Sequence, residues 1–297
     1  MSKKDPADGM GTMPFSSHLD ELRRRLFKSL LVLGVIFLVG WIGFGGTLEE
    51  FFMAPHHKAV DALAVYDPPV DVPRRLQLLS PLENVFYRLK VSALVAVLVG
   101  FPFLLYQMWS FIATGLLPPE KRAMMRFLPW SVVFALIGIA FGYFFMVPMI
   151  LEFLYAIPDP ELMEQAYRLQ DYFSIFLMFT IALALIFQLP IVMMGVGSFG
   201  LVSPKFFRKY RRHFILIAFV VGAMLTPPEP FSQILMATPT ILLYELGIIL
   251  MTISARTKAK REKKSTLTSA SQSKTESQAK AESPSDSESE ETSADKE

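Results

Sequence analysis

The stretch PFSSHLDELRRRL, Pro14–Leu26, stands immediately before the first long apolar run of the chain. Leu19, Leu22 and Leu26 recur within it at helical spacing, so a helix here has one apolar face that can lie on a membrane surface. A simple membrane anchor needs only positive residues before its apolar run, whereas this stretch carries both acidic and basic side chains. It therefore predicts an amphipathic helix, and we expect the function of the chain to begin there.

Two local patterns support that helix. Ser17 followed three residues later by Asp20 matches a capping box, which satisfies free backbone donors of a first helical turn. Asp20 with Arg24, and Glu21 with Arg25, are acid-before-base pairs at i,i+4, each contributing only a few tenths of a kcal/mol. On spacing alone, these charges indicate solvated ion pairs on an interfacial helix rather than a binding site.

Composition places the whole chain in a membrane. The sequence has 297 residues, of which 52% are hydrophobic, and its mean hydropathy is +0.40, too apolar for a soluble domain. It contains no cysteine, which excludes disulfides and thiolate catalysis. Zinc and P-loop spacings are missing from the sequence, and the net charge of +2 gives no reason to expect nucleic-acid binding. We expect an all-α polytopic membrane protein without a cofactor.

Six apolar segments are candidates to cross the bilayer, since each crossing needs roughly 20 residues. Their approximate bounds are Leu26–Gly46, Val85–Leu105, Phe127–Leu154, Tyr172–Val196, His213–Leu225 and Phe231–Thr252. The fifth is short: at about 1.5 Å per residue it reaches only about 20 Å of a core about 30 Å thick. Prolines stand in or beside four of the six, which indicates either kinked helices around a concave wall or plain packing irregularity.

Lysine and arginine predict the orientation. Twenty of them flank the spans on the side that holds both termini, against six on the other side, which includes Arg88 and Lys90. We therefore expect three parts: a cytoplasmic N-terminus with an amphipathic helix over residues 1–25, a transmembrane domain over 26–254, and a cytoplasmic tail over 255–297. The tail is basic at first and then acidic and Ser-rich, a composition that predicts disorder after Lys264. The external loop of about 47–84 is expected to fold as a cap with short helices.

Three stretches carry a resemblance to a known family. SHLDELRRRL before the first span, YQMWSFIATGLLPPEKR after the second and VVGAMLTPPEPFSQ leading into the sixth resemble the TatC subunit family of the twin-arginine protein translocase, in the same order and at similar positions. The resemblance covers roughly residues 14–252. It implies six helices with both termini inside, arranged as a cupped wall whose last two helices are short.

The resemblance also implies a function. Members of the family are receptors in the bacterial inner membrane that bind twin-arginine signal peptides of folded cargo. They assemble with small single-span partners of the TatA and TatB types for export driven by the proton-motive force. It implies a homo-oligomer within the complex, contact with the lipid bilayer, and no enzymatic activity, metal or nucleic-acid partner.

Several residues match family positions. Glu21 and Glu120 match the receptor acids, and a guanidinium pair calls for carboxylates because an Arg fork binds a carboxylate through two parallel bonds. Arg23 and Phe111 match positions of the same docking surface, and Pro55 matches a proline of the first external loop. The plainer alternatives are a positive-inside charge for Arg23, an interfacial anchor for Phe111, a simple turn at Pro55 and a first-turn acid for Glu120.

Two polar residues inside the apolar spans match family positions as well. An unpaired polar side chain in hydrocarbon costs several kcal/mol, so Gln188 and Glu245 each need a partner. Many relatives carry a glutamate where this sequence has Gln188. We expect Gln188 to dock a polar side chain of a partner's helix, the alternative being a bond to a carbonyl that Pro190 frees in its own helix. Glu245 has either an internal partner or a role in assembly.

Two other protein classes are alternatives. A secondary transporter has repeated halves with paired broken helices, and the sequence shows no such repeat. A membrane enzyme needs a nucleophile with a base or a metal cluster. The four histidines, His18, His56, His57 and His213, have no metal-ligand spacing within a span.

Overall fold

The computed structural model describes residues 15–43, 46–66, 72–115, 121, 124–157, 166–198, 200, 202–226 and 229–281, with the backbone alone for 15–17, 47 and 258–281. The elements in chain order are α1 (Phe15–Ile42), α2 (Gly46–Leu63), α3 (Pro81–Thr114), α5 (Phe127–Phe141), the π-helix η1 (Gly142–Met146), α6 (Val147–Ala156), α7 (Leu169–Ile186), α8 (Leu189–Ser198), α9 (Pro204–Lys209), α10 (Arg211–Leu225) and α11 (Pro230–Ala281).

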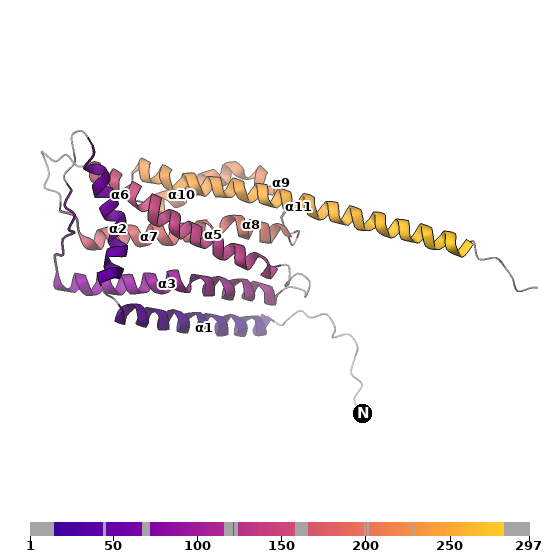
Figure 1. Ribbon diagram of the computed structural model, residues 1–297, viewed down its shortest axis with the longest axis horizontal. Helices are drawn as coiled ribbons and strands as arrows, with labels where there is room; N and C mark the ends of the chain where they lie inside the picture. Colours follow the sequence, from indigo (N-terminus) through magenta and orange to yellow (C-terminus); the bar gives the residue numbers. More distant parts are fainter. Residues whose placement is uncertain are drawn as a thin grey trace, which may run out of the picture.

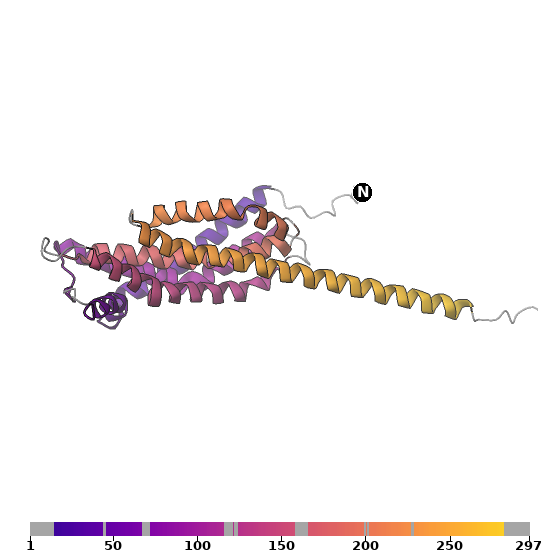
Figure 2. The same cartoon turned by 90° about the horizontal axis from the view of Figure 1, so that it is seen from above.

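The long helices run side by side, while α2 crosses one end of the bundle (Figure 1). Figure 2 shows α2 almost end-on, with α10 and α11 forming a hairpin on the opposite flank from α5. We call the end that α2 covers the cap end. The opposite end, where α1 begins and α3 ends, carries Arg24, Arg25, Arg208 and Arg211 and is called the basic end.

Five described helices or helix pairs are long and apolar enough to cross a bilayer: His18–Ile42, Pro81–Thr114, Phe127–Ala156, Leu169–Ser198 and Pro230–Thr257. They contain four of the six segments expected from the sequence and overlap a fifth, Leu26–Gly46, whose helix ends at Ile42. The remaining segment is α10, whose 15 residues reach only about 22 Å of a core about 30 Å thick. The short fifth segment is confirmed, and its crossing of the membrane stays a prediction.

The last helix differs from the expectation of two short final helices. The apolar part of α11 alone has 28 residues, and the helix then continues to Ala281 through the segment for which the sequence predicts disorder. No glycine or proline occurs between Gly247 and Pro284. Because the packed part of α11 supplies the helical nucleus, each further residue adds a hydrogen bond without a new nucleation cost. The prediction considered only core-forming ability and missed this continuation.

The start of the chain also differs in detail. α1 is one continuous helix from Phe15, so Ser17 lies inside it and the predicted capping box is wrong. The predicted boundary between an interfacial helix and the first span, at residues 25 and 26, falls within the same helix for the same reason. A 28-residue helix extends about 42 Å, which leaves its first turns beyond the hydrocarbon core.

A helix, α2, lies in the segment expected to form the external cap, and the interpretation of Pro55 as a simple turn is wrong. Pro55 lies buried in the middle of α2. Proline has no N–H, so the carbonyl of Phe51, four residues earlier, loses its helical donor. The Tyr143 hydroxyl donates to that carbonyl at 2.6 Å. Tyr172 donates to the next carbonyl, that of Phe52, at 2.5 Å, so tyrosines from η1 and α7 fasten the cap.

A second proline produces a matching contact. Pro148 follows the π-helix η1, and its missing N–H frees the carbonyl of Phe144. Lys58 of α2 donates to that carbonyl at 2.8 Å. The two contacts are reciprocal: a side chain of η1 donates to the carbonyl freed in α2, and a side chain of α2 donates to the carbonyl freed in η1.

The bundle beneath the cap depends on close helix contact between α5 and α7. A Cβ atom on Gly138 would lie 2.9 Å from the Leu183 carbonyl oxygen and equally close to the Phe187 side chain. Such a distance is shorter than side chains adopt, and the backbone oxygen cannot move aside without moving α7. Small residues permit this kind of approach in membrane bundles.

We expect Gly138→Ala to lower the stability of the folded chain by about 1–3 kcal/mol, because the added methyl group forces α5 and α7 apart. Thermal unfolding of the purified protein in detergent measures this loss. Gly34→Ala on α1 is the matched control, since no atom lies within 4 Å of its added Cβ. If the two variants unfold at the same midpoint temperature, Gly138 is not required for the close packing of α5 on α7.

His56 of α2 gives the cap a dependence on pH. Its side chain is fully buried, and its Nδ1 lies 3.0 Å from the Tyr155 hydroxyl. Burial lowers the pKa of His56 from 6.5 to about 4, and the neighbouring His57 acts in the same direction. The imidazole is therefore neutral in the folded chain at pH values where it takes up a proton after unfolding.

We expect stability to be highest above pH 6.5 and to fall as the pH drops from 6.5 toward 4, by up to about 3 kcal/mol, because only the unfolded state binds the proton in this range. Thermal unfolding at pH 7.5 and pH 5 measures the effect. His56→Phe should reduce the difference between the two pH values. His213→Gln, a change at an exposed histidine of the basic end, should leave it intact; an unchanged pH dependence in His56→Phe would refute the assignment.

Candidate functional site

Glu21 lies at the basic end, on the first turns of α1. Its carboxylate binds two neighbouring arginines of its own helix: Arg24 at 2.5 Å through Oε2 and Arg25 at 2.5 Å through Oε1. The predicted pair of Glu21 with Arg25 is confirmed, while Arg24 pairs with Glu21 rather than with Asp20. The Glu21 side chain is 16% exposed, so this carboxylate is largely covered by the two guanidinium groups.

Arg25 connects this ion pair to the next helix. It donates to the side-chain oxygen of Gln107 on α3 at 3.1 Å, and Gln107 is buried. One turn before Glu21, the His18 ring stacks on Phe111 of α3 with 4.4 Å between ring centres. Because His18 and Glu21 are three residues apart on one helix, they share a face. The structure therefore brings Glu21 and Phe111 to one surface formed by α1 and α3.

The other predicted site residues, those of the docking surface and of the external loop, are placed differently. Arg23 is exposed on α1, adjacent in sequence to the arginines that bind Glu21. Glu120 lies outside the described residues; α3 ends at Thr114, and Lys121 is described as exposed. Pro55 belongs to the cap end and is remote from Glu21 along the bundle (Figure 1).

Gln188 lies at the break between α7 and α8 and is buried. Its side-chain oxygen accepts a hydrogen bond from the Ser131 hydroxyl of α5, and its NH₂ group donates to the Ser131 backbone carbonyl at 3.1 Å. Trp109 of α3 donates its indole N–H to the same hydroxyl at 3.1 Å. The amide is thus satisfied by another helix of this chain, and not by a carbonyl that Pro190 frees. These bonds join α3, α5 and the α7–α8 break.

Glu245 has an internal partner, one of the two possibilities left open by the sequence. Arg211, the first residue of α10, binds it through two contacts, Nε to Oε1 at 2.6 Å and NH2 to Oε2 at 2.8 Å. This two-bond geometry is the strongest form of an arginine–carboxylate pair. It fixes the start of α10 to α11 at the basic end.

Sequence reasoning missed Gln107, Ser131 and the stacking role of His18. Gln107 carried a usable signal, since it is a polar residue one turn before Phe111 in an otherwise apolar run. Ser131 carried little signal, because a serine hydroxyl in a membrane helix can bond to its own backbone. Metal-ligand clusters of three or more His, Cys, Asp or Glu side chains are not found in the part of the chain that the structure describes.

Comparison with known proteins decides the family. The family model of the Sec-independent protein translocase protein TatC matches residues 17–239. The chain belongs to the TatC family. This is a family of transport proteins and not of enzymes, and its members are multi-pass membrane proteins.

Individual relatives agree with the family. The chain is 34% identical to the TatC protein of Aquifex aeolicus over 83% of this chain and 98% of that protein. It is 32% identical to TatC of Escherichia coli strain K12 over 80% of this chain and 87% of that protein. A solved structure described as the twin arginine translocase receptor TatC superposes with a TM-score of 0.66 at 32% identity, covering 80% of this chain and 99% of that one. The chain is accordingly a TatC component of the twin-arginine translocase.

We expect Gln188→Leu to lower thermal stability in detergent by about 1–2 kcal/mol, because it removes both bonds to Ser131 in hydrocarbon. Ser131→Ala should cost a similar amount, and the double variant should cost less than the sum, since both changes delete the same interaction. Additive losses would show that Gln188 and Ser131 act independently.

Proposed function

We propose that the chain is the signal-peptide receptor of a bacterial twin-arginine translocase, placed in the inner membrane with both termini in the cytoplasm. The observation that carries the proposal is Glu21 with its two arginines at the basic end. A carboxylate that already accepts two adjacent guanidinium groups has the geometry required for the arginine pair of a signal peptide. The family membership and the excess of basic residues at this end support the same orientation.

The α1–α3 surface supplies the rest of the proposed site. Phe111 and His18 form an aromatic platform beside Glu21, on which the apolar residues after the arginine pair can pack. Glu120 follows α3 in sequence and is proposed as the second acid, and Arg23, exposed on α1 two residues after Glu21, is proposed as a further contact. Two carboxylates contributed by different segments match two guanidinium groups of an extended peptide.

Assembly with partners completes the proposal. The chain nucleates a complex with TatA-type and TatB-type single-span subunits and further copies of itself, and the complex exports folded cargo using the proton-motive force. Gln188 and Glu245 are proposed partner positions, each now bound inside the chain. Docking at either residue therefore requires that its bond to Ser131 or Arg211 be exchanged for one to the partner.

We expect Glu21→Ala and Glu120→Ala each to weaken binding of a twin-arginine signal peptide by about tenfold or more, because a hydrogen bond to a charged group contributes about 1.5–3 kcal/mol. Fluorescence anisotropy with the labelled peptide and the purified chain in lipid nanodiscs measures the dissociation constant. Glu120→Arg should weaken binding further than Glu120→Ala, since it adds repulsion between like charges.

Asp20→Ala is the matched control, because it removes an exposed acid beside Glu21 without touching the described ion pairs. A peptide with both arginines replaced by lysine controls for charge alone. If both glutamate variants bind the peptide as the unmodified chain does, the receptor proposal fails.

A further inference from the structure

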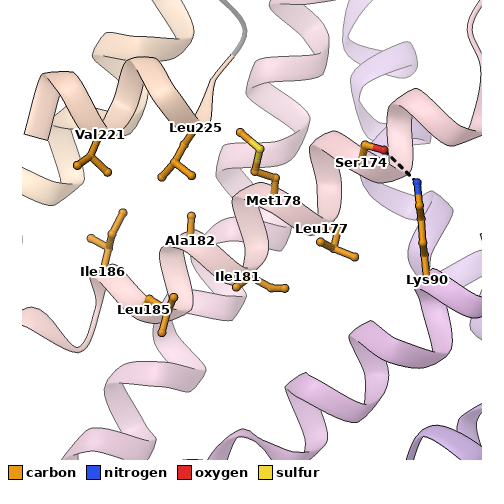
Figure 3. Close-up of a pocket in the computed structure, with 10 residues that line it drawn as sticks. All are labelled: Lys90, Ser174, Leu177, Met178, Ile181, Ala182, Leu185, Ile186, Val221 and Leu225. Carbon is orange, nitrogen blue, oxygen red and sulfur yellow. Dashed lines mark hydrogen bonds between the residues drawn. The ribbon is translucent and has the colours of Figure 1, made fainter.

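An apolar groove of about 740 Å³ runs along the exposed side of α7, between α3 and α10 (Figure 3). Two rows of α7 side chains line it: Met178, Ala182 and Ile186 face Val221 and Leu225 of α10, and Leu177, Ile181 and Leu185 lie along the side away from α10 (Figure 3). Leu185 is 58% exposed and Val221 39%, so the groove opens to the surroundings of the bundle. In a membrane-spanning chain these surroundings are lipid.

One cation stands at the end of this groove nearest the cap. Among the described residues that line the groove, Lys90 of α3 alone carries a charge. Its ammonium donates to the Ser174 hydroxyl at 3.3 Å, and Ser174 in turn donates to the Gln170 carbonyl at 2.8 Å (Figure 3). Lys90 makes no ion pair with any residue that the structure describes. Of the three N–H donors of the ammonium, two are left for a ligand.

Lys90 lies near the edge of the hydrocarbon core, within reach of the lipid headgroups. α3 has 34 residues and is therefore about 51 Å long, which exceeds a core about 30 Å thick by about 10 Å at each end. Lys90 is the tenth residue of α3 and lies about 14 Å from its start, close to where the core begins. From there the lysine stem can extend its ammonium to the headgroup level.

The groove is about as long as the hydrocarbon layer of one leaflet is thick. From Ser174 to Ile186 the groove follows α7 over thirteen residues, a rise of about 18 Å, and half of the hydrocarbon core is about 15 Å. A single acyl chain beneath one headgroup has this length, with its charge at one end.

We propose that this groove binds an anionic phospholipid, with an acyl chain along α7 and the headgroup phosphate at Lys90. A flexible chain of methylene groups fills a narrow apolar groove, and burial contributes in proportion to the apolar area covered. The phosphate supplies the negative charge that Lys90 lacks in the described structure. Neither half alone fits: a free phosphate leaves the groove empty, and a zwitterionic lipid brings its own quaternary ammonium close to Lys90 together with its phosphate.

The test compares dioleoyl phosphatidylglycerol with dioleoyl phosphatidylcholine on the full chain in detergent, using native mass spectrometry to count bound lipids over a titration. We expect the anionic lipid to bind about tenfold more tightly, because the choline cation of phosphatidylcholine repels the Lys90 ammonium and offsets the attraction of its phosphate. Lys90→Gln should abolish this preference. Arg75→Gln, which removes an exposed cation from the external loop, is the control of equal charge and should keep it.

A second pair of variants tests the acyl chain. Ile181→Trp fills the groove and should reduce binding of both lipids, whereas Leu242→Trp, at a position of α11 that is 64% exposed and outside the groove, should not. Thermal unfolding without added lipid confirms that all variants fold. Equal binding of the two lipids, loss of the preference in Arg75→Gln, or normal binding in Ile181→Trp each overturns the proposal. Exclusive crosslinking of residue 181 to a single-span subunit in native membranes would overturn it as well.

Discussion

A backbone carbonyl that has lost its helical donor needs another one wherever packing shields it from water, because an unpaired buried polar group costs free energy. The fold meets this requirement with side chains from neighbouring elements. Pro55 frees the Phe51 carbonyl, which accepts from Tyr143, and Pro148 frees the Phe144 carbonyl, which accepts from Lys58. Each bond ties the cap to the bundle. The prolines that interrupt single helices therefore create the contacts that hold separate helices together.

The same requirement explains the interior of the bundle. At the α7–α8 break, Gln188 turns away from its own helix and binds both the hydroxyl and the carbonyl of Ser131. Trp109 completes the arrangement from α3. An amide can donate and accept at once, so one side chain serves two polar groups without carrying a charge into hydrocarbon. A neutral amide at this position is consistent with a structural function that needs no titration.

The sequence predicted the features that depend on local pattern and left open those that depend on distant partners. Long apolar runs located five spans and the short α10, and the i,i+4 rule located Glu21 with Arg25. Local rules failed at helix ends, where α1 begins before Ser17 and α11 runs past Lys264. Periodicity along one helix cannot show which residue of another helix lies opposite. Gln107 and Ser131 were therefore missed, although each binds a residue that the sequence had singled out.

The arrangement around Glu21 has a consequence for how the proposed receptor would work. Because Arg24 and Arg25 already neutralise the carboxylate, an incoming arginine pair replaces ion pairs instead of adding them. The number of neutralised charges then stays constant, and association should depend only weakly on ionic strength, unlike binding driven by unpaired charges. The displaced guanidinium of Arg24, which is 65% exposed, would then be available to a lipid phosphate, while Arg25 keeps its bond to Gln107. The peptide and the bilayer would in that way be coupled through a single carboxylate.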